Sequence, residues 1–185
     1  DGLSMLLHAF NKRTGTPVKF ERQHTPLDTE RLFDAPFIYL TGHEEFTLSA
    51  KERDNLKRYL TRGGVLFAEA CCGRKGFDRS FRREMAQTFN GTALKRLPSA
   101  HPIFRFPQKV VQVTPRPGLA ARMKTRAKVK PTLLGLQMNG ATSVIYSPIG
   151  LACGWEMAAC PYCVGIGNAD ALALGINILS HILMQ

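Results

Sequence analysis

Long apolar runs, cysteines and mid-chain acidic residues are all scarce in this 185-residue sequence, and each scarcity narrows the class of protein. No stretch approaches the roughly 20 uninterrupted apolar residues that a membrane-spanning helix needs. The apolar run 171–184 is interrupted by Asn177 and His181, so we expect a buried helix there and no insertion into a membrane. Five cysteines are too few for the disulfide framework of a small secreted protein.

Acidic residues are absent between Glu84 and Glu156, although ten Lys or Arg fall in that segment. The formal net charge of +11 therefore comes mostly from the middle of the chain, which predicts an electropositive face. In 121–130, ARMKTRAKVK, cations alternate with small or apolar residues, the period of a strand with one cationic face. We favour a solvated edge strand. The alternatives are an anionic partner or nucleic acid, contacted through Arg122, Lys124, Arg126, Lys128 and Lys130.

The order of expected elements favours an α/β domain. Helices are expected at 2–15, 49–64 and 78–89, and strands at 17–21, 36–42 and 65–71. Ser49 and Glu52 form a capping box at the start of the second helix. Such alternation is typical of a parallel sheet with helical crossovers. Asn139-Gly140 predicts a β-hairpin between 132–138 and 142–148, and Asn168 is a candidate cap for the last helix. We therefore expect one three-layer α/β domain over residues 1–185, with a mostly parallel sheet and an antiparallel hairpin addition.

Two loops are expected at the carboxyl edge of this sheet, where open α/β folds bind ligands. One follows the strand 36–42 and the other is the turn after 65–71. The candidate ligand-binding residues at this edge, with the chain's one tryptophan, are Gly42, His43, Glu44, Cys72, Gly73 and Trp155.

The phrases "FIYLTGHEEF" and "LKRYLTRGGVLFAEACCG" resemble the class I glutamine-amidotransferase-like fold, in which a strand ends in a catalytic cysteine of the form Ile-Cys-Leu-Gly. Ala70-Cys71-Cys72-Gly73 places Cys71 at the nucleophile's position. Further phrases, among them "LPSAHPIF" and "VIYSPIGLACGWE", extend the similarity to an uncharacterised bacterial family of domains of unknown function assigned to that superfamily, with a flavodoxin-like arrangement. The resemblance implies Cys71 as nucleophile. His43, His101 and His8 are possible bases brought close by folding, with His43 taken as the candidate, and Glu69 or Glu44 could orient it. The amidotransferases' C-terminal His-x-Glu pair is missing, because residues 154–170 contain no histidine.

Cys160-Pro-Tyr-Cys163 is compatible with half of a zinc site, a redox pair or a structural crosslink. Zinc would use Cys153, Cys160 and Cys163, completed by Cys71, Cys72 or His43. Unlinked thiols are the remaining alternative.

Three functions thus stay open. We favour a non-catalytic amidotransferase-like module that binds a small ligand or a protein and needs no cofactor. The second is a hydrolase or amidotransferase that uses Cys71, and the third is a cysteine-cluster metal or redox module. Because the sequence starts at Asp1, we expect a processed form or an excised piece, with the compartment open between a bacterial envelope or periplasm and the cytoplasm.

Overall fold

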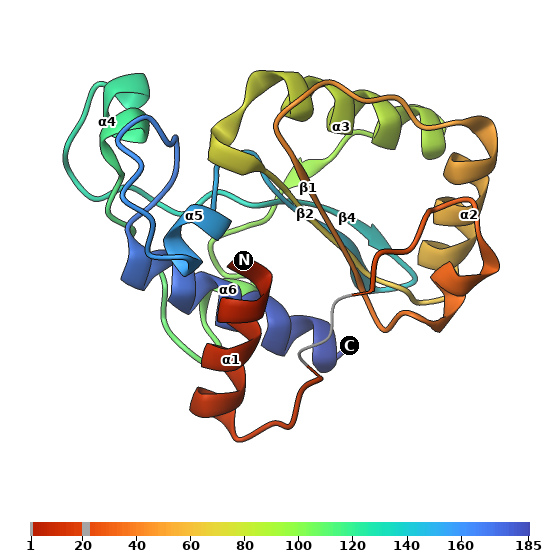
Figure 1. The fold of residues 1–185 in the computed structure, drawn as a ribbon, viewed down its shortest axis with the longest axis horizontal. Coiled ribbons are helices and arrows are strands. Elements are labelled where there is room, and N and C mark those ends of the chain that lie inside the picture. The colour runs from red at the N-terminus through yellow and green to blue at the C-terminus, as the bar shows by residue number, and fades with distance from the viewer. Residues whose placement is uncertain (1, 20–22) are drawn as a thin grey trace.

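A five-stranded mixed sheet forms the middle layer of the computed structural model, which describes residues 2–19 and 23–185 (Figure 1). The strands lie in the order β1-β2-β5-β4-β3. β1, β2 and β5 are parallel, while β4 is antiparallel to both β5 and β3. The elements are α1 (Gly2–Thr14), the 3-10 helix η1 (Glu30–Asp34), β1 (Ile38–Gly42), α2 (Ala50–Thr61), β2 (Leu66–Ala70), the 3-10 turn η2 (Cys71–Gly73), α3 (Lys75–Thr88), β3 (Lys95–Arg96), the 3-10 helix η3 (Pro102–Phe104), α4 (Pro117–Met123), β4 (Leu134–Met138), β5 (Ala141–Ser147), α5 (Ala152–Trp155) and α6 (Asn168–Leu183).

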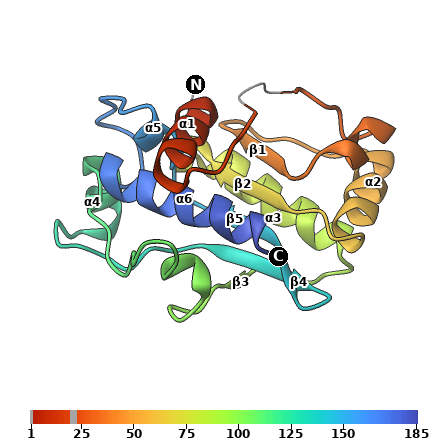
Figure 2. The ribbon, with the colours of Figure 1, turned by 90° about the horizontal axis from the view of Figure 1, so that it is seen from below.

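Helices cover both faces of the sheet, as the alternation of β2 side chains requires. Leu66 and Ala68 face α2 and α3, whereas Phe67 faces the layer of α1 and α6. α1 and α6 lie side by side on that second face (Figure 2). All five residues of β2 are buried, so the expected apolar strand has become the centre of the parallel part of the sheet. Every helix of the described residues is too short or too polar to span a bilayer.

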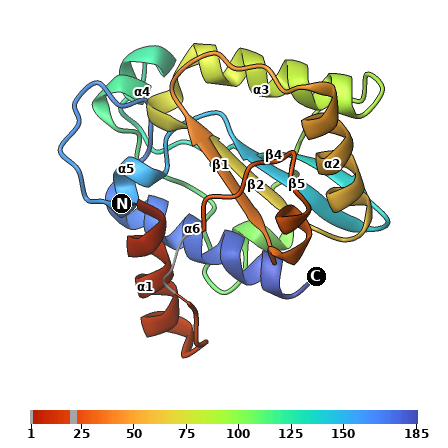
Figure 3. The same ribbon diagram turned by 45° about the vertical axis from the view of Figure 1, so that its right-hand side comes forward.

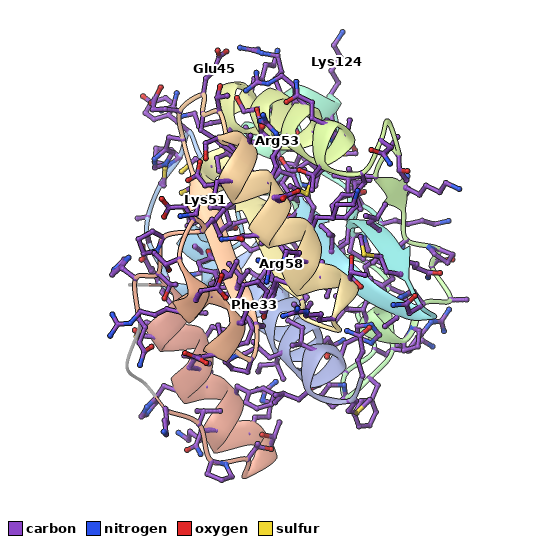
Figure 4. All side chains as sticks on the ribbon, turned by 90° about the vertical axis from the view of Figure 1, so that its right-hand side faces the viewer. Phe33, Glu45, Lys51, Arg53, Arg58 and Lys124 are labelled. Carbon is purple, nitrogen blue, oxygen red and sulfur yellow. The ribbon has the colours of Figure 1, made fainter. Side chains whose placement is uncertain are left out.

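The capping box predicted at the start of α2 is present in the structure. Ser49 accepts a hydrogen bond from the Glu52 amide, and the Glu52 side chain bonds back to the Ser49 amide, which confirms the capping box. Figure 4 looks onto this helix, where the guanidinium of Arg58 lies 4.9 Å from the ring centroid of Phe33. α2 is the crossover helix between β1 and β2, which pair in parallel.

The hairpin is confirmed, but its place in the sheet differs from the prediction. Asn139 and Gly140 both have left-handed backbone angles, with φ of 51° and 82°, as a tight hairpin turn requires. β5 is not a peripheral addition, because it pairs in parallel with β2 and is buried at the centre of the sheet. Two of the four pairings are antiparallel as a result, so the sheet is mixed where the sequence predicted a mostly parallel one.

The predicted cationic strand at 121–130 is wrong. Pro117 begins α4, which carries Arg122 and ends at Lys124 with a left-handed residue, and Thr125–Lys128 form no strand. The five cations therefore do not line one face, and Lys124 points away from the protein (Figure 4). Most residues of this segment are exposed, so the alternation of charged with small or apolar residues did not reflect a strand with one buried face.

Two smaller predictions also fail. Residues 17–19 of the expected first strand are irregular, and its residues 20–21 lie outside the described residues. Asn168 does not cap α6: Gly167 is the N-cap residue, and the Asn168 side chain accepts a hydrogen bond from Arg116 instead.

Candidate functional site: a cluster of thiols at the carboxyl edge of the sheet

The tight turn after β2 brings two cysteines to the carboxyl edge of the sheet. Cys72 has φ of 52°, a left-handed conformation that costs a non-glycine residue about 1–3 kcal/mol and that the surrounding structure must hold in place. Gly73 follows with φ of 63°, and a Cβ at that position would lie 2.8 Å from Cβ of Val164. The Val164 amide donates a hydrogen bond to the Cys72 carbonyl at 3.2 Å. A segment from the far end of the chain is thereby held against the turn.

A buried carboxylate places the second segment. Glu69 is 0% exposed, and its carboxylate accepts hydrogen bonds from the backbone amides of Leu151 and Ala152 at the start of α5. The Tyr39 hydroxyl donates a further bond to Glu69 at 2.7 Å. Burial raises the pKa of the Glu69 carboxyl. Because α5 carries Cys153, this carboxylate fixes the position of that thiol.

Glycines allow the third segment to approach. Gly150 pairs with Gly165, and a Cβ at Gly150 would lie 2.8 Å from the Cys72 amide nitrogen and 3.2 Å from Sγ of Cys163. A larger residue at position 150 would therefore push the Cys72 turn and Cys163 apart. Figure 3 shows α4, α5 and the loop that joins α5 to α6 gathered at this end of the sheet.

The three segments bring their sulfur atoms together. Sγ of Cys72 lies 3.3 Å from Sγ of Cys153, and the sulfurs of Cys72, Cys153 and Cys163 all lie within 4.8 Å of one another. His43, Cys71 and Cys72 form a second group of the same size, which shares Cys72 with the first. Cys163 is 0% exposed and Cys153 is 8% exposed, whereas His43 is exposed. The cluster thus has a closed inner end and an open outer end.

The pKa shifts of the clustered thiols have opposite directions. Hydrogen bonds from the Cys163 and Cys71 thiols lower the pKa of Cys153, and the nearby Arg116 guanidinium lowers it further. The same bonds to Cys153 raise the pKa of Cys71 and of Cys163. Ionisation of Cys153 therefore makes ionisation of its neighbours less favourable. A cation bound among the sulfurs would offset this effect, because it attracts every thiolate at once.

Two arginines bind the backbone of the segments that carry the cluster. Arg116 donates to the Cys153 carbonyl at 3.1 Å, and its Nη1 is buried with no hydrogen-bond partner among the described residues. Arg122 donates to the Gly73 carbonyl at 3.1 Å. Three or four thiolates around a divalent ion carry net negative charge, and the positive charge of Arg116, which lowers the pKa of Cys153, favours such a centre.

The other sequence-predicted residues are placed differently. Cys160 belongs to neither group of potential metal ligands among the described residues. Trp155 is 2% exposed, packs on Phe67 and donates its indole N–H to the Ala171 carbonyl, so it offers no face to a ligand. Glu44 lies exposed in the loop after β1, and a Cβ at Gly42 would lie 2.9 Å from the Phe77 ring.

The proposed catalytic arrangement assembles only in part. His43 does approach Cys71, but the bonds described for Glu69 go to α5, Tyr39 and Thr41. The strained residue of the turn is Cys72, whereas the resemblance placed the nucleophile at Cys71. A raised pKa at Cys71 also opposes the thiolate that a nucleophile needs.

Sequence reasoning missed the supporting residues Tyr39 and Arg116. Tyr39 had a detectable signal, since it lies on the strand predicted beside that of Glu69. Arg116 had none, because it approaches from a segment 37 residues before Cys153.

A model of the family described as "Domain of unknown function (DUF4159)" matches residues 1–183. The chain belongs to this family. No curated protein matches this DUF4159 domain. The family assignment agrees with the expected similarity to an uncharacterised family, and it carries no activity with it. A function must therefore be argued from the site.

Proposed function

We propose that this DUF4159 domain binds one divalent ion of the zinc class through the thiolates of Cys72, Cys153 and Cys163. The observation that carries the proposal is the convergence of these three sulfurs, from three separate segments, to within 4.8 Å of one another. In a tetrahedral site with Zn–S bonds of about 2.3 Å, the sulfurs lie roughly 3.8 Å apart. Clusters with several irons and inorganic sulfides hold their ligand sulfurs further apart, so the spacing favours a single ion.

Cys71 and His43 compete for the fourth position. Both lie within 4.8 Å of Cys72, the ligand that the two groups share. Cys71 would give the closed, all-cysteine ligand set of a structural site, and His43 would give a set of three cysteines and one histidine. His43 is exposed, so a site that uses it would exchange its ion more readily than one closed by Cys71.

The proposal develops the cysteine-cluster hypothesis and remains non-catalytic, as the favoured interpretation of the sequence was. We propose the finer fold assignment on the same basis. Parallel β1, β2 and β5, with a cysteine turn at the carboxyl end of β2, support a relationship to the class I amidotransferase-like architecture in which the catalytic edge has become a metal site. The engaged Glu69 weighs against a thiol enzyme.

Metal stoichiometry tests the proposal. Protein purified metal-free under reducing conditions should take up one Zn²⁺ or Co²⁺ per chain, with the visible absorption of a tetrahedral Co²⁺–thiolate site. Cys72→Ser and Cys163→Ser should each weaken binding more than about 100-fold, beyond the 10- to 100-fold effect of residues that only support a ligand. The matched control is Cys160→Ser, which removes a thiol on the same loop as Cys163 and should bind normally.

The fourth ligand follows from two further variants. Cys71→Ser should change the Co²⁺ spectrum if all four ligands are cysteines, and His43→Ala should change it if the fourth ligand is the histidine. Failure of reduced wild-type protein to bind a stoichiometric ion, or equal losses in Cys160→Ser and Cys163→Ser, would refute the proposal.

A further inference from the structure

An apolar cavity lies beyond the carboxyl end of β5, under α4. Its volume is about 180 Å³, and its walls include Val113, Leu119, Val129, Ile149, Leu151 and Ile166. An enclosed apolar cavity of about 150 Å³ accepts a molecule the size of benzene. The cavity here has a similar volume and is partly open to solvent, since its lining includes the exposed side chains of Met123 and Lys130. A cavity of this size, at the edge where open α/β sheets bind ligands, therefore suits a small apolar body.

The cavity is separate from the thiol cluster, although they share a wall. Successive residues of the segment after β5 face opposite ways: Ile149 and Leu151 line the cavity, whereas Gly150 contacts the Cys72 turn and Cys163. None of the cluster's cysteines lines the cavity. A ligand in the cavity and an ion among the thiols would therefore occupy opposite sides of one short segment.

The mouth of the cavity has one charge. Lys130 is exposed and is the one ionisable residue in the lining, which contains no carboxylate. The two hydroxyl side chains of the lining are already engaged, since Ser147 donates to the Ile149 carbonyl and Thr132 accepts from Arg96. The lining residues between Val113 and Leu151 come from a stretch without acidic residues, and the carboxylate of Asp170 on α6 is engaged, because it accepts a hydrogen bond from the Thr114 amide at 2.7 Å. The complementary ligand has an apolar body and a single negative group.

We propose that the cavity binds a small carboxylate with a compact apolar body, of about the size of benzoate. The hydrocarbon part fills the space between α4 and the segment after β5, and the carboxylate lies at the Lys130 ammonium. This site is independent of the metal site, and either can fail without the other.

Three probes of one shape test the assignment. Benzoate, benzyl alcohol and benzylammonium are titrated into the full chain by calorimetry and by amide chemical shifts. Benzoate should bind tightest, with a dissociation constant at or below about 1 mM, and benzylammonium weakest. Shifts should centre on residues 113, 119, 129 and 149. Failure of all three to bind at millimolar concentration, or equal affinity for benzoate and benzylammonium, overturns the proposal.

Variants separate the two parts of the recognition. Lys130→Gln should weaken benzoate roughly fivefold, the scale of a single exposed ion pair, and leave benzyl alcohol unchanged. Lys128→Gln, an exposed lysine outside the lining, should change neither. Val129→Phe should fill the cavity and weaken benzoate and benzyl alcohol together, on the order of tenfold. The two lysine variants leave the core untouched, so an unchanged benzoate affinity in Lys130→Gln overturns the charge assignment even if Val129→Phe does not fold.

Discussion

Glu69 is the side chain on which the geometry of the thiol cluster most depends. Its carboxylate is enclosed between β2 and α5, and it accepts bonds from two backbone amides and from the Tyr39 hydroxyl. Glu69→Ala would leave these donors buried without a partner, at about 1–3 kcal/mol each. We expect a loss of about 3–5 kcal/mol in the free energy of unfolding, measured by urea denaturation.

Two further variants show whether the loss comes from the hydrogen bonds. Tyr39→Phe removes one donor to a charged acceptor and should cost about 1.5–3 kcal/mol. Glu44→Gln changes an exposed carboxylate in the nearby loop and should stay within about 0.5 kcal/mol of the wild type. If Glu69→Ala were as mild as Glu44→Gln, Glu69 would not be holding α5.

The short distance between Cys72 and Cys153 predicts which disulfide forms on oxidation. Their sulfurs, 3.3 Å apart, need only a small movement to reach the bonding distance of about 2.05 Å. Treatment of metal-free protein with hydrogen peroxide should oxidise the two thiols by two electrons, with peroxide reduced to two waters. Peptide mapping without reductant should then find Cys72 linked to Cys153. Zinc-loaded protein should resist, and a Cys160–Cys163 link as the main product would contradict the prediction.

At the scale of elements, the sequence was informative wherever a local signal and burial agreed. The capping box of α2 and the Asn139-Gly140 turn depend on neighbouring residues, and the β2 strand is apolar on both faces because both are covered. The segment 121–130 alternates charged with small or apolar residues, but most of it is exposed. No packing against the rest of the protein therefore requires it to form a strand. The place of β5 beside β2 is a long-range pairing, which the hairpin signal does not contain.

The contact between α6 and the segment before η3 predicts a loss of stability in mild acid. The rings of His101 and His181 lie 4.9 Å apart, and burial lowers the pKa of both below the ordinary value of 6.5. The Thr142 hydroxyl bonds to His101, and no carboxylate among the described bonds offsets their charge. Well above pH 6.5 both imidazoles are neutral in the folded and the unfolded chain. Below it the unfolded chain binds protons first, so the free energy of unfolding falls as the pH drops towards the folded pKa values.

Each histidine can contribute a slope of at most about 1.4 kcal/mol per pH unit in that window. His181→Gln should flatten the fall between pH 7 and pH 5, as measured by urea denaturation at a series of pH values. His24→Gln, on an exposed loop, is the matched control and should follow the wild-type curve. A His181→Gln curve parallel to that of the wild type would show that this pair does not titrate differently on folding.

At the scale of the whole molecule, the thiol cluster was only partly predictable. The sequence placed Cys71 and Cys72 at the carboxyl edge, since that follows from the strand pattern alone. It did not show that Cys163 and not Cys160 would join them, because this choice depends on close backbone approaches at Gly73 and Gly150. The partners Cys72 and Cys153 are 81 residues apart in sequence, and no local pattern encodes such a contact.

An ion at this cluster would join three segments that are distant in the sequence. Its ligands come from the turn after β2, from α5 and from the loop before α6, so binding requires all three to be in place. Zinc at about 100 times its dissociation constant should add about 2.7 kcal/mol to the free energy of unfolding. For a chain of this size that corresponds to a rise of roughly 5–10 °C in the melting temperature.

Chelation of the metal-loaded protein should reverse this rise, and hydrogen exchange should locate the effect. Amides in 149–165 and in η2 should lose protection on removal of the ion, whereas those of α2, which packs on the other face of the sheet, should change little. Cys160→Ser should retain the full stabilisation and Cys163→Ser should show none. A melting temperature that chelators leave unchanged, in protein confirmed to carry the ion beforehand, would mean that the metal lies elsewhere, because ligands drawn from three segments cannot release their ion without loosening the contacts between them.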